Sequence, residues 1–114
     1  MDELTPGRRF YNDHVSYLEA NDVDGLVNSH YNIDAEMLGF VFVVRGHAAL
    51  RQPFRRYLNS LGQLRLKSTD RFVETGDAIF FESTITSNQG DIRVYDAFVL
   101  KSGKISVHFT GIKD

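Results

Sequence analysis

The chain has 114 residues, of which 42% are hydrophobic and 25% charged, which is typical of a single globular domain covering residues 1–114. Thirteen Lys and Arg oppose fifteen Asp and Glu, and a net charge of -2 favours neither nucleic acid nor an anionic membrane as partner. There is no cysteine, which excludes disulfides and thiolate metal sites. With no signal-peptide pattern and no apolar run near the ~20 residues that cross a bilayer, we expect a cytoplasmic protein.

The first predicted helix starts at residue 5. Thr5 can accept an unpaired backbone N–H as an N-cap, and Pro6 has no N–H to lose at the first helical position. Apolar and aromatic side chains then recur at helical spacing, so one stripe faces the rest of the protein. The stripe consists of Phe10, Tyr11, His14, Tyr17 and Leu18. A histidine therefore lies in the middle of a mostly apolar face.

Two more helices are predicted before the chain turns to strands. Asp22 is a suitable N-cap for a short second helix that ends near Asn32. Residues 47–62 carry apolar side chains at helical spacing and end on Gly62, where a C-cap belongs. Pro53 lies inside this third helix and is expected to kink or restart it.

Strand patterns dominate the rest of the chain. Residues 34–44 are rich in β-branched and aromatic types, which predicts one or two short strands bent at Gly39. From Leu64 onward, strand-forming runs alternate with turn signals at residues 75–77, 88–91 and 101–104, which predicts four strands in an antiparallel meander. Helices followed by strands, without alternation, indicate an α+β domain with its helices on one face of the sheet.

Three segments carry a resemblance to a known superfamily. They are HVSYLEANDVDGLVNSHYNIDAEM, RGHAALRQPF and YDAFVLKSGKISVHF, and they span nearly the whole chain in the expected order. Together they resemble nuclear transport factor 2, ketosteroid isomerase and the SnoaL-type polyketide cyclases. The resemblance implies a cystatin-like cone, in which helices and a curved antiparallel sheet enclose an apolar pocket, and a homodimer formed through the outer face of the sheet. No nucleotide fingerprint or metal-ligand spacing is present, so we expect neither a cofactor nor a metal.

The resemblance also assigns roles to three positions. Ketosteroid isomerase uses an aspartate base with an oxyanion hole of one tyrosine and one protonated aspartic acid. Asp96 matches the protonated acid, His14 matches the tyrosine and Gly39 matches the base. Because glycine cannot shuttle a proton, we expect no steroid isomerase activity. An aspartate and a histidine facing one pocket are closer to the SnoaL-like cyclases.

Two functions therefore compete. The first is a small-molecule pocket protein, a cofactor-free isomerase or cyclase, acting on an apolar carbonyl compound through Asp96 and His14. The alternative is a non-catalytic module that binds a ligand or associates as a dimer. Asp96 lies on an apolar strand face and must be partnered, protonated or functional, the structural alternative being an ion pair with an arginine such as Arg71. His14 alone would be interpreted as a core histidine, but with Asp96 it predicts a coupled pocket pair.

The side on which His108 lies depends on the register of the last hairpin. A two-residue turn at Ser102-Gly103 points His108 away from Asp96, whereas a three-residue loop places the two residues opposite each other. Three apolar residues favour the first arrangement, namely Ile105, Val107 and Phe109.

The other candidates are assigned by their position along the predicted elements. Glu82 is expected to face outward, and His30 and His47 to be ordinary surface or cap residues near helix ends. The predicted ligand-binding wall consists of Phe10, Leu18, Met37, Phe54, Tyr57 and Phe98, together with His108 if the hairpin register allows it.

Overall fold

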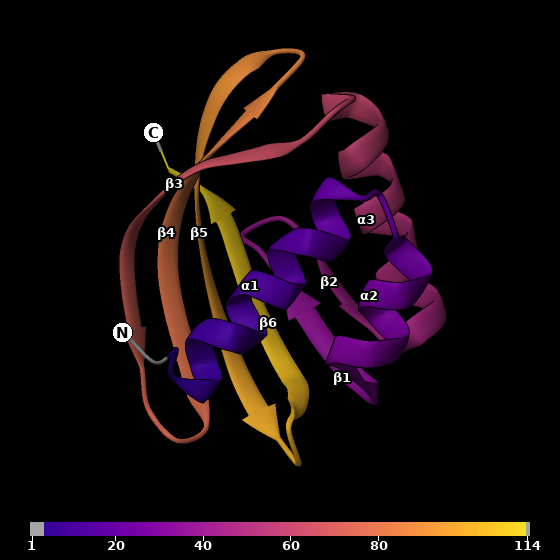
Figure 1. The fold of residues 1–114 in the computed structure, drawn as a ribbon. Helices are drawn as coiled ribbons and strands as arrows, with labels where there is room; N and C mark the ends of the chain where they lie inside the picture. The colour runs from indigo at the N-terminus through magenta and orange to yellow at the C-terminus, as the bar shows by residue number, and fades with distance from the viewer. Residues whose placement is uncertain (1–3, 114) are drawn as a thin grey trace.

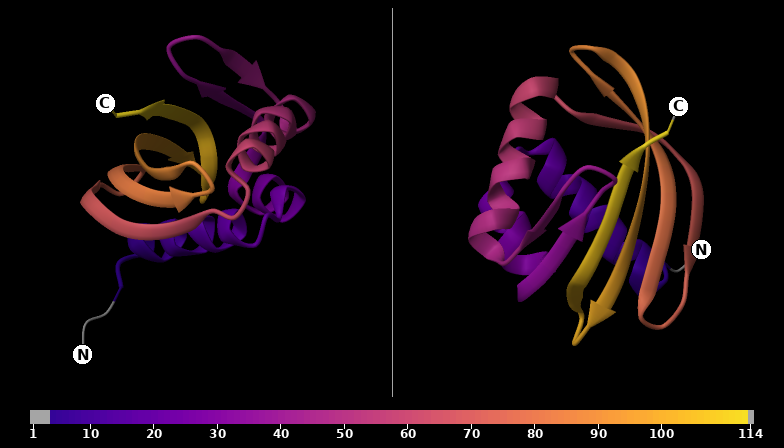
Figure 2. Two further views of the ribbon diagram at one scale, coloured as in Figure 1. Left: turned by 90° about the horizontal axis from the view of Figure 1, so that it is seen from above. Right: turned by 180° about the vertical axis from the view of Figure 1, so that it is seen from behind.

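Three helices and six strands form the protein, seen in a computed structural model that describes residues 4–113. In chain order the elements are α1 (Pro6–Glu19), α2 (Val23–His30), β1 (Tyr31–Leu38), β2 (Val43–Arg45), α3 (His47–Leu61), β3 (Arg65–Glu74), β4 (Ala78–Ser87), β5 (Gly90–Lys101) and β6 (Lys104–Ile112). The strands make one sheet in the order β2-β1-β6-β5-β4-β3. Figures 1 and 2 show that this sheet is strongly curved and that the helices pack against its concave face. The predicted α+β cone is confirmed.

The start of α1 is fixed by both local and distant contacts. The Thr5 hydroxyl accepts the backbone N–H of Arg8 at 3.1 Å, as an N-cap should. Glu74, at the end of β3, accepts the backbone N–H of Gly7 at 3.1 Å and also bonds the Thr5 hydroxyl. A side chain at position 7 would push the Glu74 carboxylate aside, so glycine lets this carboxylate bond the start of the helix. These contacts hold α1 across the concave face of the sheet.

The middle of the chain departs from the predicted boundaries. The cap of α2 is Asp22, whose Oδ1 accepts the Gly25 N–H at 2.9 Å, but the helix ends at His30 and β1 begins at once with Tyr31. The predicted end near Asn32 was therefore two residues late. A short hairpin after Leu38 separates β1 from β2, which confirms two strands in this region. Helix α3 continues through Pro53 without a restart.

The sheet is mixed. Strands β3 to β6 form the predicted antiparallel meander, with β4 pairing β3 and β5, and β5 pairing β6. Strand β1 runs parallel to β6, so Met37 lies beside His108 and Leu38 beside Phe109. This pairing brings the N-terminal half of the chain into the same layer as the C-terminal hairpin, and it corrects the expectation of a purely antiparallel sheet.

Candidate functional site

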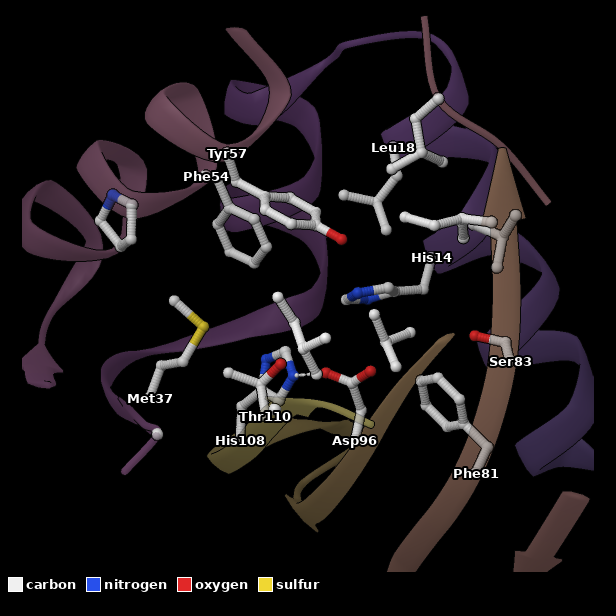
Figure 3. Close-up of a pocket in the computed structure, with 18 of the residues that line it drawn as sticks. His14, Leu18, Met37, Phe54, Tyr57, Phe81, Ser83, Asp96, His108 and Thr110 are labelled. Carbon is white, nitrogen blue, oxygen red and sulfur yellow. Dashed lines mark hydrogen bonds and ion pairs between the residues drawn. The ribbon is translucent and has the colours of Figure 1, made fainter. Parts of the chain in front are cut away.

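A cavity of about 420 Å³ lies between the helices and the concave face of the sheet. This is within the usual size of small-molecule sites. Most of its wall is apolar, and a few polar side chains point into it (Figure 3). The apolar wall includes Leu18, Met37, Phe54, Tyr57, Phe81, Ile85 and Val94, and the polar part includes His14, Ser83, Asp96, His108 and Thr110. The exposed tip of the β1–β2 hairpin, Phe40 and Val41, lies at the cavity rim.

Asp96 is held in place by His108. The Asp96 Oδ1 atom lies 2.7 Å from Nε2 of His108, and the Nδ1 atom of the same ring lies 2.8 Å from the Tyr31 hydroxyl. A neutral imidazole satisfies both neighbours if its Nε2–H donates to the carboxylate and its Nδ1 accepts from the hydroxyl. Burial, followed by the charge of Asp96, raises the pKa of Tyr31 well above its usual value, so this hydroxyl keeps its proton. The chain Tyr31–His108–Asp96 therefore fixes the orientation of the carboxylate.

The second carboxylate oxygen is open to the cavity. Asp96 lines the cavity, and among residues 4–113 every fully buried side-chain nitrogen or oxygen has a hydrogen-bond partner. Since Oδ2 makes no hydrogen bond to protein, it must be reachable from the cavity. One oxygen of Asp96 is thus used for positioning and the other faces any bound ligand.

His108 lies inside the cone because of a β-bulge. The turn of the last hairpin has two residues, Ser102 and Gly103, both with positive φ, as favoured above. However, Val99 pairs with Val107 and Leu100 with Ile105, so Ser106 is an extra residue in β6. An extra residue reverses the facing of everything that follows it. The expectation that His108 points away from Asp96 was therefore wrong.

His14 projects from the middle of α1 into the cavity, but its bonded partner is not Asp96. Its Nδ1 lies 3.4 Å from Nδ1 of His30, at the end of α2. His14 is 3% exposed, and burial, then the nearby His108 and His30, lower its pKa well below the usual value. The expected direct pair of His14 with Asp96 is replaced by two adjacent pairs, His14 with His30 and Asp96 with His108.

Tyr57 and Ser83 add hydroxyl groups to the cavity wall. Figure 3 shows the Tyr57 hydroxyl pointing from α3 toward the space beside His14 and above Asp96. Burial, followed by the charge of Asp96, raises the pKa of Tyr57 to about 12, so its hydroxyl is a permanent hydrogen-bond donor near neutral pH. The site thus combines one carboxylate acceptor with donors on the other side of the same space.

Of the other predicted ligand-binding residues, some line the cavity and some pack behind its wall. Leu18, Met37, Phe54 and Tyr57 line the cavity as expected. Phe10 and Phe98 do not line it. Phe10 stacks on His30 with ring centroids 4.0 Å apart, and Phe98 packs edge-on against His108 at 4.7 Å, behind the wall.

Glu82 and His47 do not line the cavity. Glu82 faces outward as expected and pairs with Lys113 at 2.9 Å and with Arg71 at 3.7 Å, so Arg71 is not the partner of Asp96. His47 contacts the backbone oxygen of Tyr31 at 2.9 Å, near the start of α3.

Two contributors to the site were missed from the sequence. His30 was expected at the surface but is 6% exposed, because α2 ends against α1 and directs this ring inward. Tyr31 was not considered because the first strand was expected to begin three residues later. The period-two apolar series Tyr31, Ile33, Ala35 and Met37 in the sequence could have identified it, although an irregularity in β1 leaves Ile33 itself exposed.

Gly39, which the resemblance matches to the base, lines the cavity. A Cβ atom there would come 2.8 Å from a ring carbon of Phe42 and 3.2 Å from the backbone oxygen of Thr110. A side chain at this position would therefore crowd Phe42 in the β1–β2 hairpin and the backbone of β6. Within residues 4–113, no three His, Asp or Glu side chains converge as metal ligands, and none of the helices there is long and apolar enough to cross a membrane.

Solved structures with the same fold cover nearly the whole chain. A candidate isomerase of the SnoaL-like family from Agrobacterium tumefaciens has a TM-score of 0.81 at 13% identity, covering 97% of this chain and 100% of that one. A candidate polyketide cyclase from Sinorhizobium meliloti has a TM-score of 0.77 at 14% identity, covering 90% and 94%. TerC, co-crystallised with polyporic acid, has a TM-score of 0.77 at 17% identity, covering 96% and 92%. No curated protein matches the sequence.

The cone and its open cavity have the NTF2-like fold. The sequence model of the SnoaL-like domain matches residues 8–108. The chain therefore belongs to the SnoaL-like domain family.

Proposed function

We propose that the cavity binds a small, mostly apolar carbonyl compound and that Asp96 moves a proton on it while His14 donates a hydrogen bond, in a cofactor-free isomerase or cyclase reaction. The observation that supports this most directly is the Asp96 carboxylate, fixed by His108 at 2.7 Å and open to an apolar cavity of about 420 Å³. The co-crystal of TerC with polyporic acid supports a small organic ligand for a cavity in this fold.

In the proposed step, Asp96 Oδ2 removes a proton from the carbon next to the carbonyl group. The C–H electron pair becomes the C=C bond of an enolate, and the carbonyl π pair moves onto the oxygen. Tyr57 and His14 donate hydrogen bonds to that oxygen, where negative charge develops. Asp96 then returns the proton to the same or another carbon, and no electrons are gained or lost overall.

Hydrogen exchange on a simple ketone tests this step without knowledge of the natural substrate. In D₂O, the protein should accelerate loss of the α-protons of 2-tetralone, an apolar bicyclic ketone, and Asp96→Asn should lower the protein-dependent rate at least about tenfold. Proton NMR measures the rate, and Glu82→Gln on the outer face is the control that should keep it. Binding of 2-tetralone without exchange would leave the ligand-binding module in place of the enzyme. If 2-tetralone neither binds nor exchanges its α-protons, the result would contradict both the enzyme and the ligand-binding module.

The outer face of the sheet favours the second candidate, a dimeric association module. One apolar row crosses four strands in register: Val73 beside Phe80, Phe80 beside Ala97, and Ala97 beside Phe109. Val73 is 61% exposed, Phe80 51% and Phe109 44%. A contiguous exposed apolar surface of this kind is typical of an interface. It is compatible with a catalytic cavity on the opposite face.

We therefore expect a homodimer through this outer row. Sedimentation equilibrium at micromolar concentration should give twice the chain mass, and Phe80→Glu with Phe109→Glu should give a monomer because both charges would be buried in the interface. Phe40→Glu, at the more exposed cavity rim, is the control for an added surface charge and should remain dimeric. A wild-type protein that stays monomeric at higher concentrations would contradict the interface.

A further inference from the structure

Two histidine rings meet at the cavity wall, one in the wall and one behind it. His14 forms part of the wall, and His30 lies behind it, with the two Nδ1 atoms 3.4 Å apart. The His30 ring is held by aromatic neighbours on α1, stacked on Phe10 at 4.0 Å and edge-on to Tyr17 at 5.4 Å. Because the ring cannot turn freely, its Nδ1 is directed at His14.

Only one of the two facing nitrogens can carry a proton if the contact is to be a hydrogen bond. Burial, His108 and His30 together oppose a positive charge on His14, so its imidazole is neutral and carries a single N–H. Either His14 donates from Nδ1 and leaves a bare Nε2, or it accepts at Nδ1 and keeps its proton on Nε2. The two tautomers offer opposite groups to a ligand.

The charges on the cavity side favour the second arrangement. Asp96 lies in the wall of the same cavity, so a lone pair on His14 Nε2 would add to the negative potential there, while an N–H group would be attracted. Tyr31, on β1, and His108, on β6, also face the His14 ring and are already bonded to each other, whereas the Tyr57 hydroxyl beside it can accept from an N–H group as well as donate. A developing negative charge on a ligand oxygen would favour the same N–H.

His30 can carry its proton on Nδ1 and leave Nε2 without one, and it loses no hydrogen bond by doing so. Its Nε2 has no protein partner, and every fully buried side-chain nitrogen or oxygen among residues 4–113 has one, so this atom reaches solvent. Water can donate to it or accept from it equally well. Burial lowers the pKa of His30 to about 4 against the smaller opposing effect of the Asp13 charge, so this ring too is neutral and carries a single N–H.

We infer that His30 is a positioning residue: its Nδ1–H donates to Nδ1 of His14, so that His14 presents Nε2–H to the cavity as a hydrogen-bond donor for a ligand oxygen. This inference rests on the proposed function for the identity of the acceptor. The tautomer itself exists in the free protein and is measured without any ligand.

Long-range ¹H–¹⁵N correlation spectra of the imidazole rings test the inference at pH 7. Wild-type His14 should carry its proton on Nε2. His30→Phe keeps an aromatic ring against Phe10 but removes the donor, and the ratio of Nε2–H to Nδ1–H tautomers of His14 should fall about fivefold, the effect of one hydrogen bond. His30→Asn places an amide nitrogen on the same Cγ and should restore the wild-type ratio. His47→Phe, outside the cavity, is the control that should leave the His14 signals unchanged.

Two results would overturn the inference. The first is a wild-type His14 protonated on Nδ1, which needs no variant to observe. The second is a His14 tautomer ratio that is the same in His30→Phe and wild type. Neither result depends on α-proton exchange, so failure of the positioning role and failure of the proposed reaction are distinguishable.

Discussion

Replacing His108 with phenylalanine should lower the free energy of unfolding by about 3 kcal/mol, because the Asp96 carboxylate would lose its partner in a mostly apolar wall. The side chains of His108 and Asp96 are 4% and 12% exposed, so solvent replaces the lost bond only in part. Asp96→Leu should cost about 2 kcal/mol by leaving the Nε2–H of His108 unpaired. Urea denaturation monitored by circular dichroism measures both values.

The double variant decides whether the two residues act as one unit. Asp96→Leu with His108→Phe removes both polar groups, so its loss should be smaller than the sum of the single losses by about 1–3 kcal/mol. The matched cycle of Asp96→Leu with His14→Phe should show a smaller coupling, because His14 bonds His30 and not Asp96. Additive effects for Asp96 and His108 would mean that their contact contributes nothing to stability.

Acidification from pH 7 to pH 4.5 should destabilise the protein through its buried histidines. Burial lowers the pKa of His30 from 6.5 to about 4, and the pKa of His14 falls well below its usual value for the same reason. In the unfolded chain both rings take up a proton near pH 6.5, whereas in the folded protein they do so only at lower pH. The unfolded state binds more protons in this range, so the free energy of unfolding falls as the pH falls.

The expected loss from His30 is about 2 kcal/mol between pH 7 and pH 4.5, and His14 adds to it. Urea denaturation at intervals of pH measures the slope. The interval from pH 7 to pH 5 is the most informative, since the paired carboxylates Asp24, Asp70 and Glu82 have lowered pKa values and stay ionised there. His30→Phe should show a shallower slope. A wild-type free energy that is flat over this interval would show that neither ring is buried as a neutral group.

Local chemistry was sufficient to predict most of the elements. The N-caps Thr5 and Asp22 and the turn at Ser102-Gly103 lie where the sequence predicts them, because each depends on a few neighbouring residues. The boundary between α2 and β1 was misplaced, since the exchange of helical for extended backbone at Tyr31 is set by pairing with Ile105 in β6. Pro53 was expected to interrupt α3, but the packing of Leu50, Phe54 and Leu58 on the core keeps the helix continuous.

For the site, the sequence by itself determined that Asp96 and His14 face the interior, because each lies on an apolar stripe whose phase follows from helix or strand periodicity. It could not determine their partners. His108 reaches Asp96 only because one extra residue, Ser106, reverses the facing of β6, and Tyr31 reaches His108 across 77 positions only because β1 pairs parallel to β6. A bulge and a long-range strand pairing are chosen by the packing of the whole cone, so these contacts were decided by the tertiary structure alone.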